Sequence, residues 1–447
     1  KSTSRGHIKS GIVVLIDLSK IEIVDFHCHP ATRSVSNLMN IIDIGALETI
    51  LPISVTEDMR RAGGESIVKV EVSSEESEKL REKVRSYEKK YNISSLRKNV
   101  RRQYMSIPST RDFIRYVARA FDCEATLERI DEMVSNRIKK DLVGYMRSVL
   151  DRENIGMAVL DLFGSKEVVD FPKDRCYWIY RIRRQLYPDW FKERGLTSLS
   201  QALDAVEEDM KEAVEKGCSG FKNIEAILRT LEIEGLAEEE ARYAFRSLLK
   251  AKPSRYRVTG NIPMYEKPED KKNLRLFQDF LIRHMLILAG KFGLPFLFHT
   301  GAEGIPGRYP DLRNSNPTNL YPILVDDEIV KTKIVMLHGS YPYYREAAIM
   351  THMFGNLYIE FSPLVFYHGD LKETLRIFLE FVPAHKILYG SDSFCTPELF
   401  GYNAWLIRRI LSEVLEDFRE KHGWTKEECM QAAEMIMNRN AKEVLGK

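Results

Sequence analysis

The sequence has no excess of either charge. Its 67 lysines and arginines almost match its 65 aspartates and glutamates, which gives a formal net charge of +2 over 447 residues. A protein that binds nucleic acid mainly by neutralising phosphates needs a larger basic excess, although local basic patches remain compatible with this composition. We therefore expect no nucleic-acid partner.

Cysteines are few, scattered and never spaced as a Cys-x-x-Cys pair. This spacing indicates neither a structural zinc ribbon nor a disulfide framework. Long hydrophobic runs are also lacking, because the apolar stretch 11–18 contains Asp17 and is too short to cross a bilayer. It has no small-residue cleavage site, so we expect no signal peptide and no membrane association, although the missing initiator Met leaves the true N-terminus open. A reducing, cytoplasmic location fits these absences.

Short apolar runs separated by helical patterns are abundant. Such alternation is typical of βαβ units and a parallel sheet, and eight strands close a (β/α)8 barrel. The predicted strands cover 21–28, 155–163, 176–182, 219–222, 294–299, 333–338, 357–361 and 386–391. We predict one α/β barrel domain over 1–447, with helical insertions at 63–150 and 224–290 after the first and fourth strands.

Histidine and aspartate follow these strands directly. His27 and His29 end the first strand and, being two residues apart, point to the same face. His299, His338 and Asp392 follow the fifth, sixth and eighth strands. Active sites of such barrels lie at the carboxyl ends of the strands, so these residues predict a metal site there. The alternative is that each is a hydrogen-bonded rim residue.

Further polar residues are weaker candidates. Lys222 ends the fourth strand, and His368 follows the seventh by a few residues. Several arginines near predicted strand ends could bind a substrate carboxylate, but each is also a plausible surface residue: Arg181, Arg183, Arg184, Arg308 and Arg313. The remaining histidines lie in or beside helical patterns or near the start of the chain, and we assign them no role in the site.

Several of these motifs resemble the amidohydrolase superfamily, in particular its amidohydrolase-2 group. They are His27-Cys28-His29, His299-Thr300-Gly301, His338-Gly339-Ser340-Tyr341-Pro342 and Leu388-Tyr389-Gly390-Ser391-Asp392. The stretches 311–317 and 221–224, with Arg229-Thr230, are similar to the amidohydrolase domain joined to glutamine-synthetase-like proteins. The resemblance covers the first strand and most of 155–412.

The resemblance implies that His27, His29, His299 and Asp392 bind a divalent metal, zinc before manganese. His338 would be a further ligand or a catalytic group. Lys222 would either be carbamylated and bridge two ions, or stay an ammonium that contacts an anionic substrate; one ion is the default expectation.

We therefore expect a metal-dependent hydrolase that cleaves an amide-type C–N bond of a small, carboxylate-bearing molecule. A metal lowers the pKa of a bound water to about 7. Asp392 could then accept its proton, while His338 stabilises the oxyanion. The alternatives are a non-oxidative decarboxylase on the same barrel, and a metal-binding barrel with little turnover. We expect a small-molecule substrate as the partner, and a homo-oligomer is compatible with the sequence.

Overall fold

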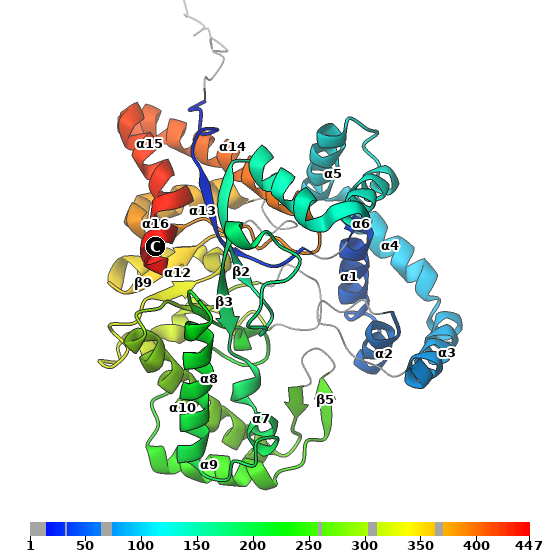
Figure 1. The fold of residues 1–447 in the computed structure, drawn as a ribbon, viewed down its shortest axis with the longest axis vertical. Helices are drawn as coiled ribbons and strands as arrows, with labels where there is room; N and C mark the ends of the chain where they lie inside the picture. Colours follow the sequence, from blue (N-terminus) through cyan, green and yellow to red (C-terminus); the bar gives the residue numbers. More distant parts are fainter. Residues whose placement is uncertain (1–14, 32–33, 64–73, 258–261, 303–310, 363–369) are drawn as a thin grey trace, which may run out of the picture.

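Eight parallel strands form the centre of the molecule and follow one another in chain order (Figure 1). The computed structural model describes residues 15–31, 34–63, 74–257, 262–302, 311–362 and 370–447. The strands are β1 (Ile23–Cys28), β2 (Ile155–Asp161), β3 (Cys176–Arg181), β4 (Phe221–Asn223), β7 (Phe296–Phe298), β8 (Ile334–Met336), β9 (Leu357–Glu360) and β10 (Ile387–Leu388).

The last strand region returns to the first. The Phe26 amide donates to the carbonyl of Tyr389 over 2.9 Å, and the Asp392 amide donates to the carbonyl of His27 over 2.8 Å. These bonds join the β10 end of the sheet to β1. The predicted (β/α)8 barrel is therefore confirmed.

The inside of the barrel is filled by apolar side chains that alternate along the strands, among them Val24, Phe26 and Leu388. The helix α16 (Asn440–Leu445) contributes Val444 and Leu445 to the same cluster. Lys333, just before β8, donates to the carbonyls of Glu443 and Val444, so α16 closes the amino-terminal end of the strands. The opposite, carboxyl end is left for the site.

The long helical segment after β1 begins at Val35 and includes the predicted insertion 63–150. It comprises α1 (Val35–Leu47), α2 (Ile53–Gly63), α3 (Ser74–Tyr91), α4 (Ile93–Ser106), α5 (Pro108–Phe121) and α6 (Leu127–Arg152). In Figure 1 these helices extend to one side of the barrel. They are anchored to it at the buried Glu398, which accepts hydrogen bonds from Tyr145 and Arg152.

The insertion after β4 is not wholly helical. Between α9 (Glu238–Lys250) and α10 (Pro268–Lys291) the chain forms an antiparallel pair, β5 (Arg255–Arg257) and β6 (Ile262–Met264). Each strand has three residues and β6 contains Pro263, so neither is long enough to reveal an alternating pattern.

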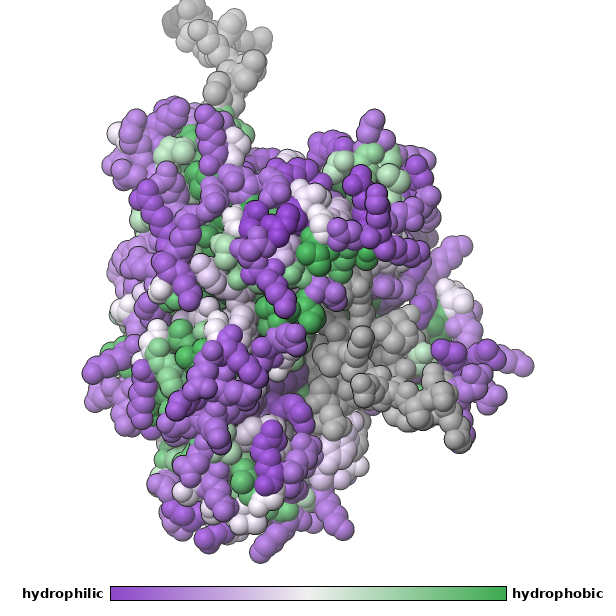
Figure 2. All heavy atoms as spheres, viewed as in Figure 1, coloured by the Kyte–Doolittle hydropathy of each residue, from purple (hydrophilic) through white to green (hydrophobic). Residues whose placement is uncertain are grey.

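The other helices cover the barrel. They are α7 (Pro188–Lys192), α8 (Leu199–Glu215), α11 (Tyr321–Leu324), α12 (Tyr344–Met353), α13 (Leu371–Phe381), α14 (Pro397–His422) and α15 (Lys426–Glu434). The face in Figure 2 is mostly hydrophilic with scattered apolar residues. Among the ranges that the structure describes, no helix has the length and apolar character needed to cross a membrane.

Candidate active site

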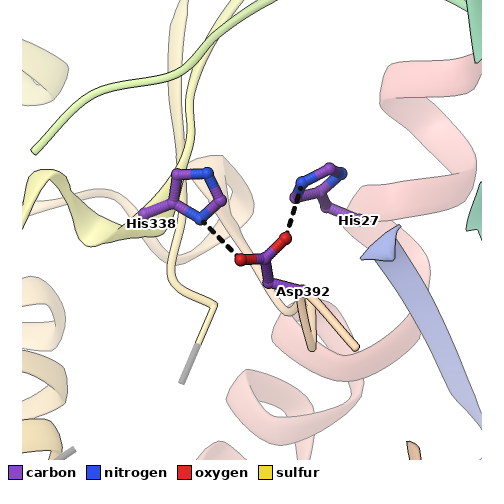
Figure 3. Close-up of side chains that lie close together, drawn as sticks. All are labelled: His27, His338 and Asp392. Carbon is purple, nitrogen blue, oxygen red and sulfur yellow. Dashed lines mark ion pairs between the residues drawn. The ribbon is translucent and has the colours of Figure 1, made fainter. Parts of the chain in front are cut away.

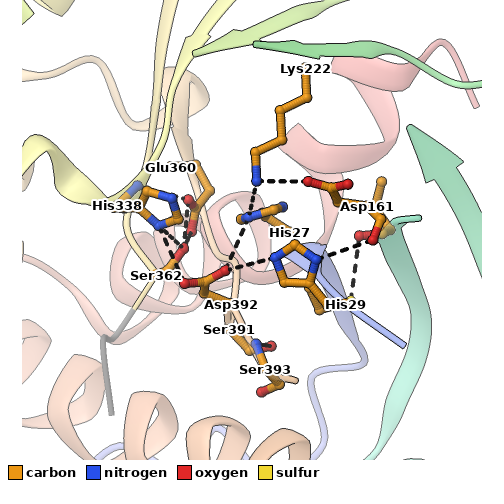
Figure 4. A network of polar contacts seen from close by, with 12 residues as sticks. His27, His29, Asp161, Lys222, His338, Glu360, Ser362, Ser391, Asp392 and Ser393 are labelled. Carbon is orange, nitrogen blue, oxygen red and sulfur yellow. Dashed lines mark hydrogen bonds and ion pairs between the residues drawn. The ribbon is translucent and has the colours of Figure 1, made fainter. Parts of the chain in front are cut away.

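His27 and His29 meet at one carboxylate oxygen. His27 lies in β1 and His29 directly after it, and their Nε2 atoms lie 3.2 and 3.3 Å from Oδ1 of Asp392 (Figure 4). The carbonyl oxygen of Asp161 lies 3.1 Å from Nδ1 of His29. A carbonyl can only accept a hydrogen bond, so Nδ1 of His29 carries a proton and Nε2 is the ring atom that faces Asp392.

Two further imidazoles approach the same carboxylate from the neighbouring strand ends. His338 places Nδ1 3.8 Å from Oδ2 of Asp392, and donor atoms of His27, His338 and Asp392 all lie within 4.8 Å of one another (Figure 3). The ring of His299 lies 4.6 Å from that of His338. Its Nε2 is buried and has no hydrogen-bond partner in the described part of the chain.

Burial determines the protonation of these groups. Removal from water lowers the pKa of both His27 and His299 to about 3 and that of His338 well below its usual range, and the nearby Lys222 charge acts in the same direction. Burial would raise the pKa of Asp392, but the surrounding imidazoles lower it well below its usual range. Neutral imidazoles around an ionised carboxylate, with an unpartnered buried nitrogen, fit a divalent cation.

One side of this cluster is occupied by charges. The Lys222 ammonium lies 2.9 Å from Oδ2 of Asp161 and 2.9 Å from Nε2 of His27. Arg181 also binds Asp161, through Nε at 2.9 Å. Burial would raise the pKa of Asp161, but Arg181 and Lys222 lower it well below its usual range, so the carboxylate is ionised. Burial lowers the pKa of Lys222.

The opposite side is built from hydroxyl and carboxyl groups. Ser362 Oγ lies 3.2 Å from Nδ1 of His338 and donates to Glu360, which is fully buried at the end of β9. Burial raises the pKa of Glu360 to about 8, so this carboxyl is largely protonated at neutral pH. Figure 4 places the two residues beside His338, away from Lys222.

Comparison with known proteins agrees with this arrangement. The family model described as Amidohydrolase matches residues 24–447. The chain belongs to this amidohydrolase family. The predicted family is therefore confirmed.

The relatives of this chain differ widely from it in sequence. Protein fluG of Emericella nidulans is 28% identical over 234 residues, which are 50% of this chain and 25% of fluG. The chain thus spans about a quarter of the length of the curated relative that it matches.

Among solved structures, one assigned as a metal-dependent hydrolase from Lactobacillus casei is 18% identical, with a TM-score of 0.64 over 97% of this chain and 98% of that one. The uronate isomerase of Thermotoga maritima is 16% identical, with a TM-score of 0.62 over 96% and 95%. Both likenesses concern the fold and include the helical segment after β1.

The remaining predicted site residues lie away from the cluster around Asp392, are paired with other residues, or lie outside the described part of the chain. Arg313 is exposed and pairs with Asp311, and Arg184 is exposed and pairs with Glu193. Arg183 lies 3.4 Å from the buried Glu225. Arg308 and His368 lie outside the described residues.

Sequence reasoning missed Asp161, Glu360 and Ser362. Asp161 was hidden in an apolar run that we assigned only as a strand. The available signal was its position at the end of β2, where it pairs in register with Ile179 of β3. Glu360 similarly ends β9, and both are acidic residues at the catalytic edge of the barrel.

Proposed function

We propose that this chain is a metal-dependent hydrolase that cleaves an amide-type C–N bond of a small anionic molecule. One divalent ion, zinc or manganese, would be held by His27, His29, His299 and Asp392. The observation that carries the proposal is the position of Asp392, whose Oδ1 contacts His27 and His29 while Oδ2 faces His338. When bound, the ion would supply a Lewis acid and lower the pKa of a water at the site to about 7.

Two side chains would handle the proton and the developing charge. Asp392 is ionised and lies between His27 and His29 on one side and His338 on the other. It can therefore accept a proton from water and return it to the leaving nitrogen. His338 is the imidazole next to it and would donate a hydrogen bond to the substrate oxygen as negative charge develops.

The charges of the site favour an anionic substrate. Lys222 and Arg181 carry two positive charges, which the two negative charges of Asp161 and Asp392 balance. The two positive charges of a divalent ion would therefore not be balanced by these side chains, and an anionic substrate could balance them. Lys222 already pairs with Asp161 as an ammonium, which supports a site with one metal ion. A carbamylated Lys222 would lose this pairing and could instead bridge two metal ions.

A second candidate reaction is the isomerisation of a sugar acid. The fold likeness to uronate isomerase extends over 96% of this chain and therefore includes the helical segment beside the barrel. A sugar acid is also an anion, so the charge argument does not separate the two reactions. Decarboxylation of an aromatic or unsaturated acid is the third alternative.

Metal analysis and product analysis together test the proposal. We expect about one equivalent of zinc or manganese per chain, activity that a chelator removes, and restoration by the added ion. The screen should use N-acyl amino acids, uronates and aromatic acids, with release of amine, isomerisation and release of carbon dioxide as the three readouts. Amine release supports the hydrolase; isomerisation or carbon dioxide alone replaces it. Bound metal without turnover across the screen would favour a binding protein.

We also propose a cytoplasmic location and a small molecule as the principal partner. All six cysteines are free, which fits a reducing compartment. Light scattering on the purified chain would decide whether it forms a homo-oligomer.

A further inference from the structure

The chain around Asp392 departs from a regular strand. Asp392 has a φ of 48°, in the left-handed region that residues with a side chain seldom occupy. The amides of Ser391 and Asp392 both donate to one carbonyl, that of His27, over 3.1 and 2.8 Å. A regular parallel ladder has evenly spaced bonds, so two successive amides on one carbonyl mark a turn. Such a conformation persists only where surrounding contacts fix it.

Asp25 holds this turn from β1. Its Oδ1 accepts a hydrogen bond from the Ser391 amide over 2.8 Å, and its Oδ2 lies 2.5 Å from the Ser391 hydroxyl. Asp25 and Ser391 are both fully buried. The His29 amide donates to the carbonyl of Ser393 over 2.7 Å. The residues on both sides of Asp392 are therefore tied to β1 and to the residue directly after it.

Asn403, on α14, holds the same turn from a helix. Its Nδ2 donates to the carbonyl of Ser391 and to the hydroxyl oxygen of Ser393, each over 3.1 Å. A carbonyl can only accept a hydrogen bond, so the nitrogen of the Asn403 amide is the atom that faces Ser391. Figure 4 places Ser391 and Ser393 on the side of Asp392 away from Lys222.

These contacts end on the neighbours of Asp392 and not on its carboxylate. The carboxylate stays available to the imidazoles, with Oδ1 at 3.2 and 3.3 Å from the Nε2 atoms of His27 and His29. The turn is also closely packed on its other side, because a Cβ on Gly390 would lie 2.4 Å from Oε1 of Glu360. A small shift of the backbone would change both distances to the imidazoles.

We propose that Asp25 and Asn403 are positioning residues that fix the turn around Asp392, and with it the carboxylate that faces the imidazoles. The importance of this position for a metal ion rests on the proposed function. The hold on the turn does not, so the two claims can fail separately.

The test uses variants of the full chain. Asn403→Ala removes both donors to the turn, and Asp25→Ala removes both acceptors. Asp25→Asn should restore the turn, because its side-chain oxygen still accepts from the Ser391 amide and its nitrogen donates to the Ser391 hydroxyl oxygen. Ser391→Ala is a milder change that decides the question where an alanine variant does not fold. It removes only the hydroxyl that links Asp25 to the Ser393 amide.

Asn440→Ala is the matched control. Asn440 is also buried, and its Nδ2 donates over 2.7 Å to two main-chain carbonyls at the opposite, amino-terminal end of β10. This variant therefore loses the same two donors as Asn403→Ala, at the same strand but remote from the site.

The first readout is amide hydrogen exchange of residues 389–393 in metal-free protein, relative to exchange of β8 in the same sample. One hydrogen bond contributes a factor of roughly 2 to 12 to an equilibrium, so the loss of two should speed exchange by about 10-fold or more. We expect this increase in Asn403→Ala and Asp25→Ala, and none in Asp25→Asn or Asn440→Ala. Unchanged exchange in both test variants, or an equal increase in Asn440→Ala, overturns the proposal.

The second readout is the dissociation constant for Zn²⁺ alone, measured by competition with a coloured chelator. Loss of a group that orients a metal ligand typically costs about 10- to 100-fold in affinity, which we expect for Asn403→Ala and not for Asn440→Ala. In an Asp392→Ala background the same Asn403→Ala change should add no more than about twofold, because Asn403 acts through that carboxylate.

The outcomes separate the two claims. Full additivity of the losses in the double variant would overturn the positioning role. If the native chain binds no Zn²⁺ while Asn403→Ala speeds exchange at residues 389–393, the result would count against the proposed function and leave the hold on the turn standing.

Discussion

The two sides of Asp392 are built from different interactions. On one side, Lys222, Asp161 and Arg181 form a buried group of full charges. On the other, Glu360 and Ser362 hold His338 through hydrogen bonds, and the Glu360 carboxyl is largely protonated at neutral pH. The same carboxylate therefore lies between a charged side and a nearly uncharged side.

The two sides should respond differently to the loss of one side chain. A buried charge is stable only while its partner remains, so removal of one member of the charged side should reduce the stability of the whole protein. A network of neutral hydrogen bonds can lose one bond at a smaller cost in stability. The loss of one such hydrogen bond should mainly change the position of the His338 imidazole and therefore the rate of the reaction. The predictions below compare the two sides.

The largest effect is expected at Asp392, which both sides share. Asp392→Asn keeps the shape and one weakly binding oxygen but removes the basic carboxylate, so kcat should fall by about 10²- to 10⁴-fold. Folding should survive, because the apolar strands form the barrel core. The rate and metal content of the variant should be measured together. Near-normal turnover at full metal occupancy would remove Asp392 from the mechanism.

The next effect tests the charged side. Asp161→Ala leaves Lys222 and Arg181 without their shared carboxylate, which should lower the free energy of unfolding by about 3–5 kcal/mol. Urea denaturation measures this loss. Asp174→Ala is the control, since Asp174 is 62% exposed and pairs with Arg147 at the surface, so its loss should cost less. Equal losses in the two variants would contradict a special role for the buried charges.

The sequence predicts those parts of the site that follow from local patterns. His27, His299, His338 and Asp392 each come directly after an apolar run, so the run places the residue at a strand end and the barrel brings the ends together. The same logic located Lys222. Each of these predictions needs only one predicted strand and the type of the residue at its end.

The partners of these residues could not be predicted in this way. Asp161 on the neighbouring strand pairs with Arg181, and the sequence did not indicate this partner. That pairing depends on the register of β2 against β3, which neither strand encodes alone. The link from Glu360 to His338 likewise depends on two adjacent strands and on the space at Gly390.

A smaller effect is expected at His338, on the neutral side. His338→Asn should leave most of the metal bound, because four other ligands are proposed, and should lower kcat by about 10²- to 10³-fold. Its free energy of unfolding should change less than that of Asp161→Ala. His352→Asn on α12 is the control, since His352 is exposed and its Nδ1 lies 3.0 Å from the carbonyl of Phe381 at the surface. Loss of the bound ion from His338→Asn would instead make His338 a ligand.

The smallest effect is expected at Arg313. A comparison of Arg313 with Arg181 tests which of the two arginines contacts an anionic substrate. The Arg313 side chain is 88% exposed and pairs with Asp311, and exposed ion pairs contribute only about 0–1 kcal/mol. Arg313→Ala should therefore leave stability nearly unchanged and KM within about twofold, because about 0.4 kcal/mol corresponds to a factor of two. Arg181 is 12% exposed and shares Asp161 with Lys222, so Arg181→Gln should raise KM more than Arg313→Ala does. Steady-state kinetics with one anionic substrate and its neutral amide analogue would separate the two positions. A large rise in KM for Arg313→Ala, confined to the anion, would move substrate recognition from the charged side of Asp392 to the loop after β7.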